Sequence, residues 1–240
     1  MKNVLVVIPA FNEQETIQTA IKEIKRIANK SKTFDISALV INDGSTDLTE
    51  AKAKEASYLV VSLPINLGIG GAVQTGYKYA MANDYDIVVQ YDGDGQHCVD
   101  DILFLVDTLI DHKVNIVIGS RFIEKTDYRP SLARKLGMLF SEKLLYLVTG
   151  KVVKDTTSGF RALDKKAIEL FSTDYPEMFA GVIPLVIAFR NGLSYKEVKS
   201  KFKYRVVGKS SINVYKSFFY PIKVSLAVFS IVLRMKGSEK

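Results

Sequence analysis

The sequence predicts an α/β fold with a mostly parallel central sheet flanked by helices. Over the first 120 residues, short apolar runs rich in β-branched residues alternate with stretches of helical periodicity. The apolar runs are continuous rather than alternating, which is typical of strands buried on both faces. Strands that alternate with helices imply parallel strands with helices packed on both sides of the sheet.

Five strands are expected in this part of the chain, at residues 4–8, 37–41, 58–63, 87–91 and 115–118. The helices expected between them span residues 13–29, 46–55, 70–83 and 100–111. Ligands of such sheets bind past the carboxyl ends of the strands. The loops that follow these strands are therefore the places to look for a site.

The second half of the chain does not continue this alternation of strands and helices. We expect helices at residues 131–148, 165–171 and 178–190, a polar loop leading to a strand or turn at 154–163, and a partly alternating strand at 195–206. No repeat, low-complexity tract or Pro/Gly-rich linker separates the halves. The organisation predicted is one catalytic domain, residues 1–212, followed by a basic amphipathic segment, residues 213–240.

Composition and charge narrow the class of protein. The 240 residues are 48% hydrophobic and 25% charged, as in an ordinary globular protein. The single cysteine, Cys98, rules out an internal disulfide and fits a reducing, cytoplasmic compartment. The net charge is +7, yet residues 194–240 alone carry 11 Lys/Arg and 2 Asp/Glu, so the rest of the chain is slightly acidic. Such asymmetry indicates an anionic partner, and the absence of zinc-finger, RNP-type or helix-turn-helix patterns favours a membrane surface over nucleic acid.

The basic tail is also apolar. Its longest uncharged stretch, residues 224–233, has 10 residues, whereas a spanning helix needs roughly 20. Lysines and arginines flank it at Lys216, Lys223, Arg234 and Lys236. We expect a helix lying in the interface of the inner face of the cell membrane. The alternatives are a helix packed on the body of the protein, on another subunit, or on a small membrane-protein partner.

Polar or glycine-rich loops follow each of the five expected strands. They occupy residues 9–13, 42–47, 64–71, 92–97 and 119–122. Strand-end turns often contain Asp, Asn and Gly for backbone reasons alone. Five in succession, several with carboxylates, predict one composite site at a single rim of the sheet.

The fourth of these loops carries two neighbouring carboxylates, Asp92 and Asp94. Carboxylate oxygens suit hard divalent ions, which bind through one or two carboxylates together with substrate phosphates. A solvated Asp-Gly turn is the alternative. Taken with the other loops, the pattern favours a cation site.

Five motifs, in this order along the chain, resemble those of family 2 glycosyltransferases. They are Val-Val-Ile-Pro-Ala-Phe-Asn-Glu at 6–13, Asn-Asp-Gly-Ser-Thr-Asp at 42–47, Asp-Gly-Asp-Gly-Gln-His at 92–97, Gly-Ser-Arg-Phe at 119–122, and Asp-Thr-Thr-Ser-Gly-Phe-Arg at 155–161. The pattern is similar to the branch of dolichol-phosphate mannose synthase, whose acceptors are polyprenyl phosphates. The resemblance covers residues 2–211 and implies a GT-A-type nucleotide-sugar-binding fold.

The resemblance implies roles for individual residues. The nucleotide would be held by Pro9, Phe11, Glu13, Asp43 and Gly68, and Mg²⁺ or Mn²⁺ on the diphosphate by Asp92, Asp94 and Gln96. Helix N-terminal charge complementarity is the alternative for Glu13. Arg121 and Arg161 would meet the acceptor phosphate or donor diphosphate, because guanidinium groups match phosphate oxygens. A late basic loop with Arg205, Lys209 and Ser210 would close over the phosphates, although each of these could be a plain surface residue.

Asp155 is the candidate carboxylate beside the sugar. It would stabilise cation-like character at the anomeric carbon, act as a base toward a hydroxyl acceptor, or only orient an arginine or the acceptor. A lipid phosphate is already an anion and needs no strong base.

We therefore expect an inverting, metal-dependent transfer of a hexose from a UDP- or GDP-linked sugar to a polyprenyl phosphate. UDP-glucose or UDP-N-acetylglucosamine is expected ahead of GDP-mannose. The alternatives are transfer to a hydroxyl of a glycan or lipid in cell-surface polysaccharide synthesis, and a non-catalytic nucleotide-sugar-binding protein.

Overall fold

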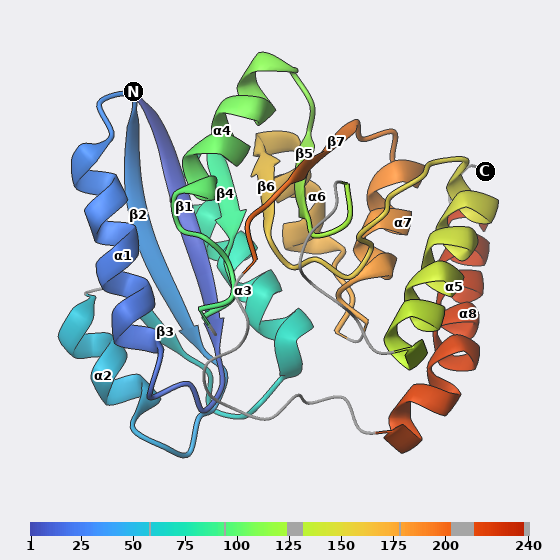
Figure 1. Cartoon of the computed structure of the whole chain (residues 1–240), viewed down its shortest axis with the longest axis horizontal. Helices are drawn as coiled ribbons and strands as arrows, with labels where there is room; N and C mark the ends of the chain where they lie inside the picture. Colours follow the sequence, from blue (N-terminus) through green and yellow to red (C-terminus); the bar gives the residue numbers. More distant parts are fainter. Residues whose placement is uncertain (58, 94, 124–131, 178, 203–213, 238–240) are drawn as a thin grey trace.

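A computed structural model describes residues 1–240 except Tyr58, Asp94, 124–131, Met178, 203–213 and 238–240. Within this part of the chain, seven strands form one sheet in the order β3-β2-β1-β4-β6-β5-β7 (Figure 1). The strands are β1 (Lys2–Ala10), β2 (Phe34–Asn42), β3 (Val60–Ser62), β4 (Ile87–Gln90), β5 (Ile116–Ser120), β6 (Arg161–Asp164) and β7 (Tyr195–Lys199). The helices are α1 (Ile17–Lys30), α2 (Thr49–Ala56), α3 (Gly68–Ala82), α4 (Asp101–Asp111), α5 (Leu132–Thr149), α6 (Lys165–Thr173), α7 (Val182–Arg190) and α8 (Val214–Gly237). The predicted mostly parallel α/β architecture is confirmed.

One strand runs against the others. β6 pairs in antiparallel fashion with both β4 and β5, whereas the remaining pairings are parallel. The segment that enters β6 therefore lies at the sheet edge where the parallel strands end. This reversal brings residues 155–160 to the rim that carries the loops after β1, β2, β4 and β5.

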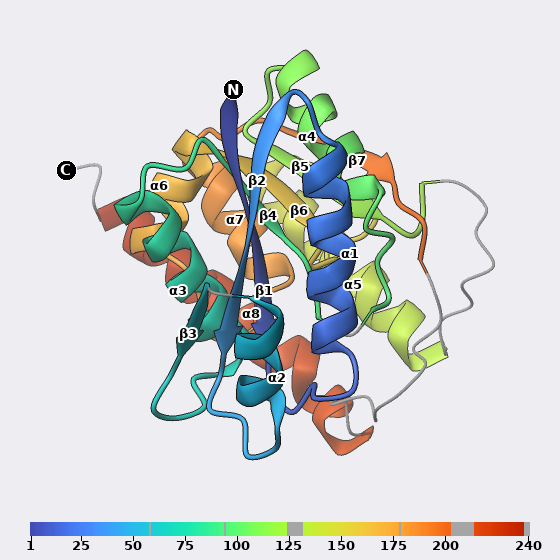
Figure 2. The same cartoon turned by 90° about the vertical axis from the view of Figure 1, so that its left-hand side faces the viewer.

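Two layers of helices cover the sheet (Figures 1 and 2). Helices α1 and α4 pack on one face, where Ile21 and Leu105 join strand residues in one core. Helices α3, α6 and α7 pack on the other face, with Tyr77, Phe171 and Leu185 in a second core. Because both faces are covered, the strands bury continuous apolar runs, as the sequence pattern predicts.

Helices α5 and α8 lie side by side outside α7, at the edge of the molecule farthest from α1 (Figure 1). Residues 182–189 of α7 are all buried, because α5 and α8 cover it. Val224 and Val228 of α8 face this core and are buried. The tail helix thus packs on the body of the protein through one face, which was one of the alternatives left open. Among the helices that the structure describes, none has the length and hydropathy needed to cross a bilayer.

Most elements begin or end a few residues from the expected bounds, and three of these differences have a visible cause or limit. Helix α1 begins at Ile17 instead of residue 13, because the Glu13 carbonyl accepts the Thr16 N–H in a preceding turn. Helix α7 begins at Val182, because Phe179 has a positive φ of 59° that ends regular structure before it. Strand β7 ends at Lys199, and the expected continuation to residue 206 falls partly outside the described residues.

Candidate active site

The first two rim loops form one hydrogen-bonded unit. The Asn12 N–H donates to Ser45 Oγ at 3.0 Å, and the Thr46 N–H donates to Asn12 Oδ1 at 2.9 Å. The Glu13 N–H donates to Thr49 Oγ1 at 2.8 Å. Pro9 lies within the last part of β1, in register with Ile41 of β2. The turn that follows it is fixed against the loop after β2, and the Phe11 side chain in this turn is exposed.

Asp43 binds the third loop to the second. Its buried carboxylate accepts the Leu67 N–H at 2.7 Å, and its carbonyl accepts from the Asn66 side chain at 3.0 Å. Gly44 lies between them with φ 66°, and a Cβ there would come within 2.8 Å of the Asn66 nitrogen. The structure gives Asp43 this loop-fixing role, and its contact with a nucleotide stays a prediction. Gly68 begins α3 with φ 79°, a conformation that favours glycine.

Asp92 follows β4, and its carboxylate lies against Gly159 of the segment that enters β6. Its side chain is 35% exposed, and His97 Nε2 lies 3.4 Å from Oδ2. Burial raises the pKa of Asp92, but the hydrogen bond from His97 and the positive charges of Arg121 and Arg161 outweigh burial. The pKa of Asp92 is therefore lowered. Asp92 is therefore a carboxylate over the physiological pH range.

Aromatic contacts fix the His97 ring beside the Asp92 carboxylate. Its ring is buried and stacks on Phe160 with centroids 4.7 Å apart, and it meets Phe202 edge-on at 5.3 Å. Tyr91 donates its hydroxyl hydrogen to the His97 carbonyl at 3.1 Å. The loop that carries Asp92 is thus fixed at its far end.

The loop after β4, residues 92–97, carries the predicted ligands of a divalent ion. An ionised, partly exposed carboxylate is the ligand type that Mg²⁺ and Mn²⁺ prefer. Gln96 is partly exposed nearby in the same loop, whereas Asp94 lies outside the described residues. Among the residues that are described, no cluster of three or more Asp, Glu, His or Cys side chains is present. Asp92 is consequently the one carboxylate of the predicted ligand set whose geometry can be stated.

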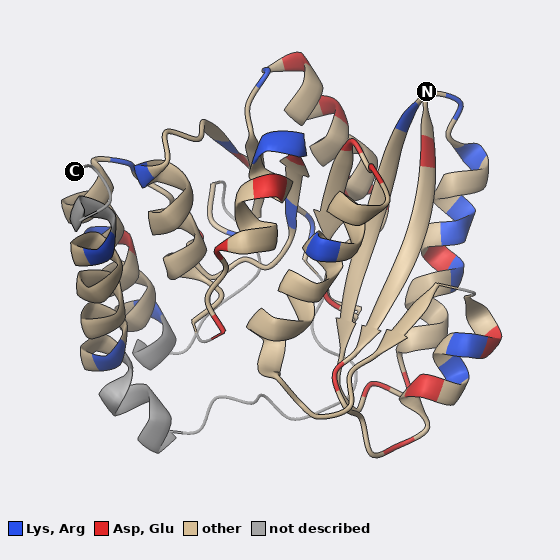
Figure 3. Ribbon diagram, turned by 180° about the vertical axis from the view of Figure 1, so that it is seen from behind, with Lys and Arg blue, Asp and Glu red and all other residues tan. Residues whose placement is uncertain are grey.

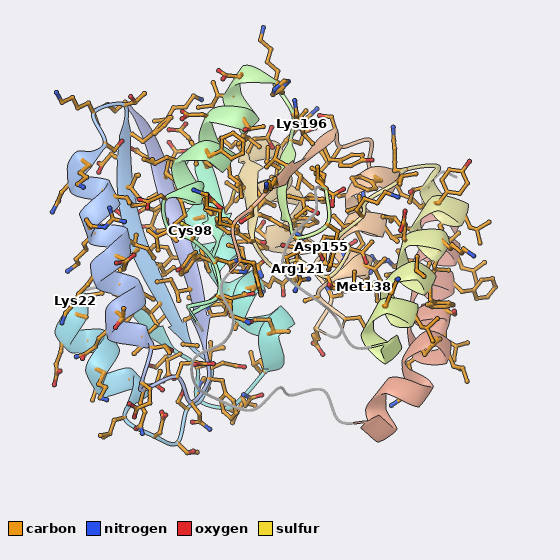
Figure 4. All side chains as sticks on the ribbon, viewed as in Figure 1. Lys22, Cys98, Arg121, Met138, Asp155 and Lys196 are labelled. Atoms are coloured by element: carbon orange, nitrogen blue, oxygen red, sulfur yellow. The ribbon has the colours of Figure 1, made fainter. Side chains whose placement is uncertain are left out.

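Arg121 and Asp155 form a buried two-pronged ion pair, and Figure 4 shows them side by side near the centre of the molecule. Arg121 Nε donates to Asp155 Oδ2 at 2.7 Å, and Nη2 donates to Oδ1 at 2.7 Å. The Arg121 backbone N–H also donates to Oδ2 at 3.1 Å, and the Thr157 hydroxyl donates to Oδ1 at 3.1 Å. Asp155 is fully buried, while 13% of the Arg121 side chain is exposed. This geometry favours the orienting role of Asp155 over direct action on a substrate.

Arg161, by contrast, lies inside the protein. Its side chain is 1% exposed, and its Nη2 donates to the carbonyls of Gly181 at 2.8 Å and Thr156 at 3.3 Å. It fixes the backbone of the β6 loop and adds positive charge near Asp92. Contact with a phosphate stays a prediction for Arg161, and the structure itself supports a scaffolding role.

Sequence reasoning missed two side-chain relationships at this rim. Gly159 belongs to the motif at residues 155–161. The motif does not predict that Gly159 leaves space for the Asp92 carboxylate, because this contact follows from the antiparallel insertion of β6. Thr157 binds both members of the ion pair, because its hydroxyl also accepts from Arg121 Nη2 at 2.7 Å. Arg205, Lys209 and Ser210 lie outside the described residues.

The fold and the rim together define an α/β protein with an acidic loop and a buried arginine–carboxylate pair at one edge of a mostly parallel sheet. The chain belongs to glycosyl transferase family 2, whose model matches residues 5–171. It is therefore a glycosyltransferase.

Named relatives agree with this assignment, and a solved structure shares the fold. The chain is 29% identical over 220 residues to the UDP-N-acetylglucosamine–dolichyl-phosphate N-acetylglucosaminyltransferase of Methanococcus voltae, with 83% of this chain and 85% of the relative covered. It is 26% identical over 223 residues to the polyprenol monophosphomannose synthase of Mycolicibacterium smegmatis, with 87% and 80% covered. The glucosyl-3-phosphoglycerate synthase of Mycobacterium tuberculosis, solved with Mn²⁺ and UDP-glucose, shares the fold with a TM-score of 0.71 at 23% identity, covering 94% of this chain and 78% of that one.

Proposed function

We propose that this chain transfers a hexose from a UDP- or GDP-linked sugar to a polyprenyl phosphate, with inversion, at the inner face of the cell membrane. The observation that carries the proposal is the Arg121–Asp155 pair. Asp155 is the candidate base, and both of its carboxylate oxygens already accept hydrogen bonds from Arg121. An acceptor that is already anionic needs no base, and it benefits from a fixed guanidinium.

The two relatives named above support the acceptor class, since their names give dolichyl phosphate and a polyprenol monophosphate product. The comparison covers 85% of the first relative and 80% of the second. The sugars in the two names differ, N-acetylglucosamine in one and mannose in the other, and we retain UDP-glucose or UDP-N-acetylglucosamine as the first donors to test.

The proposed reaction follows from the groups at the rim. Asp92 would hold Mg²⁺ or Mn²⁺ together with Asp94 and Gln96, and the bound ion would offset the charge that develops on the departing nucleoside diphosphate. Arg121, held by Asp155, would orient the acceptor phosphate beside the anomeric carbon. One phosphate oxygen forms the new C–O bond as the bond to the nucleoside diphosphate breaks, and a single displacement inverts the anomeric centre.

The proposed membrane contact is the outer face of α8 together with the adjoining part of α5. On α8, Ile222, Leu226, Phe229 and Leu233 are exposed, although the opposite face of the same helix already packs on the core. Leu136, Leu139 and Leu147 of α5 are exposed as well. The sequence of α8 contains lysines and arginines but no Asp or Glu, and Figure 3 shows blue basic positions on the coloured part of this helix. Apolar side chains with flanking positive charge suit an anionic bilayer.

The test is a transfer assay with polyprenyl phosphate, Mn²⁺ and a panel of radiolabelled sugar nucleotides. We expect labelled polyprenyl-phosphate sugar from at least one donor, loss of product on addition of a chelator, and recovery on addition of Mn²⁺ or Mg²⁺. Asp92→Asn is expected to lower turnover at saturating donor, because an amide is a weaker ligand than a carboxylate. Turnover that is insensitive to chelator, or transfer only to hydroxyl acceptors, would refute the proposal.

A further inference from the structure

Strand β7 contributes a carboxylate to the site region that belongs to none of the rim motifs. Glu197 lies at the middle of β7, and its backbone is in register with Ile118 of β5. Its Oε1 accepts the Asp155 N–H at 2.8 Å, and its Oε2 accepts the Lys154 N–H at 2.9 Å. One carboxylate therefore holds two consecutive backbone amides of a loop 42 residues away in sequence.

These two amides directly precede the carboxylate that holds Arg121. Asp155 accepts from the Arg121 backbone N–H at 3.1 Å and from two nitrogens of its guanidinium at 2.7 Å each. The contacts thus form a chain from Glu197 on β7, through the backbone of Asp155, to the guanidinium after β5. Hydrogen bonds to a carboxylate are short and strong, so the start of this chain is fixed to the sheet.

From this geometry we infer that Glu197 is a positioning residue for the transfer reaction, acting through Asp155 on Arg121. The inference rests on the proposed function for its kinetic consequence. Glu197 itself touches the backbone of residues 154 and 155 and contributes no group to the rim. Glu197 holds the Asp155 backbone in the position from which both carboxylate oxygens accept hydrogen bonds from Arg121.

The same strand supplies a matched control. Tyr195, two residues before Glu197 and on the same face of β7, donates its hydroxyl hydrogen to the Val152 carbonyl at 2.6 Å. Tyr195→Phe removes a hydrogen bond between β7 and the same loop without touching the amides of residues 154 and 155. A general loosening of the loop would follow from either substitution, whereas misplacement of Asp155 follows only from Glu197→Gln.

In Glu197→Gln the amide oxygen still accepts one N–H, but the amide NH₂ group faces the other and cannot accept it. We expect kcat to fall by about tenfold, because misplacement of a catalytic group by about 1 Å can cost up to about 100-fold, with the donor KM unchanged within about twofold. Tyr195→Phe should leave kcat within about twofold of the wild type, although it should lower Tm about as much as Glu197→Gln does. In the double variant with Asp155→Asn, Glu197→Gln should add no further loss, because both act on one guanidinium.

A second readout does not depend on turnover. The Arg121 amide hydrogen is bound by Asp155, so hydrogen exchange at Arg121 should be faster in Glu197→Gln and unchanged in Tyr195→Phe. Unchanged exchange at Arg121, equal kinetic effects of the two variants, or full additivity with Asp155→Asn would overturn the inference. Absence of transfer by the wild type with every donor would refute the proposed function instead, and the exchange experiment would still decide the role of Glu197.

Discussion

Gly159 leaves the space in which the carboxylate of Asp92 lies. A Cβ at position 159 would come within 2.8 Å of Asp92 Oδ2 and 2.9 Å of Oδ1, and within 3.0 Å of the Gln90 amide nitrogen. Contacts this short are not found for real Cβ atoms, so even one methyl group must displace the carboxylate or the strand beside it. The glycine is therefore required by the predicted metal ligand and not by an unusual φ.

Gly159→Ala is expected to weaken Mn²⁺ binding and to lower turnover by at least about tenfold, while overpacking costs about 1–3 kcal/mol of unfolding free energy. Mn²⁺ titration by calorimetry and urea unfolding measure the two effects. Gly137→Ala is the control, because a Cβ at Gly137 in α5 meets open space. Wild-type Mn²⁺ affinity in Gly159→Ala would contradict the role assigned to Asp92.

Asp155→Asn separates the two acceptor classes. If Asp155 only orients Arg121, the variant keeps measurable transfer to polyprenyl phosphate, with a loss of no more than about 100-fold. If Asp155 is the base for a hydroxyl acceptor, its removal costs the whole general-base contribution, about 10²–10⁴-fold. Single-turnover assays with each acceptor measure the difference.

A fold control accompanies this variant. Breaking a buried ion pair costs about 3–5 kcal/mol, so unfolding free energy must be measured beside the rate. Arg121→Lys keeps the charge but loses the two-pronged contact, and it should lower phosphate transfer to a similar extent. Loss of all activity in Asp155→Asn with a folded protein and an active Arg121→Lys would favour the hydroxyl acceptor.

Asp47 supports the fold in a pH-dependent way. Its carboxylate accepts the Thr49 N–H at 2.9 Å and the Gln14 N–H at 3.3 Å. Burial raises its pKa, but the hydrogen bonds from Thr49 and Gln14 outweigh burial and lower the pKa below the ordinary 3.8. A lowered folded pKa means that the stabilisation is complete above the unfolded value and is lost as the pH falls through the folded one.

Asp47→Asn should therefore reduce the unfolding free energy at pH 7 by about 1 kcal/mol, and the difference from the wild type should shrink as the pH falls below about 4. Urea unfolding over a pH series measures it. Asp35→Asn, at an exposed position of β2, should change stability by less than about 0.5 kcal/mol throughout. A difference for Asp47→Asn that stays constant from pH 7 to pH 3 would contradict the hydrogen-bonding account.

The alternation of apolar runs and helical stretches was sufficient to predict the parallel sheet and the rim on which the loops meet. Local pattern could not predict that β6 inserts antiparallel between β4 and β5, since pairing partners are set by the whole sheet. That insertion decides that Gly159 meets Asp92 and that Asp155 meets Arg121. The same insertion buries Arg161 of β6, whose contact with a phosphate stays a prediction.

The tail helix shows the same limit. Its amphipathic character was predicted, but its apolar residues occupy two faces, and only the structure assigns Val224 and Val228 to the core. The remaining outer face, with Leu226 at 64% and Phe229 at 61% exposure, is what the proposed membrane contact requires. Substitutions on that face therefore test the contact without disturbing the packing on α7.

Leu226→Asp and Phe229→Asp are expected to lower binding to anionic vesicles by at least about tenfold each, because burial of one such side chain contributes about 1.5–3 kcal/mol. Phe104→Asp is the matched control, since Phe104 is 50% exposed on α4, in the opposite layer. Binding of the wild type should also weaken at high salt, because the lysines and arginines of α8 are screened. Vesicle sedimentation measures all three, and unchanged sedimentation of both α8 variants would contradict the membrane contact. If the wild type is instead a dimer that these substitutions dissociate in ultracentrifugation, the face joins two subunits, and the acceptor lipid must reach Arg121 by another surface.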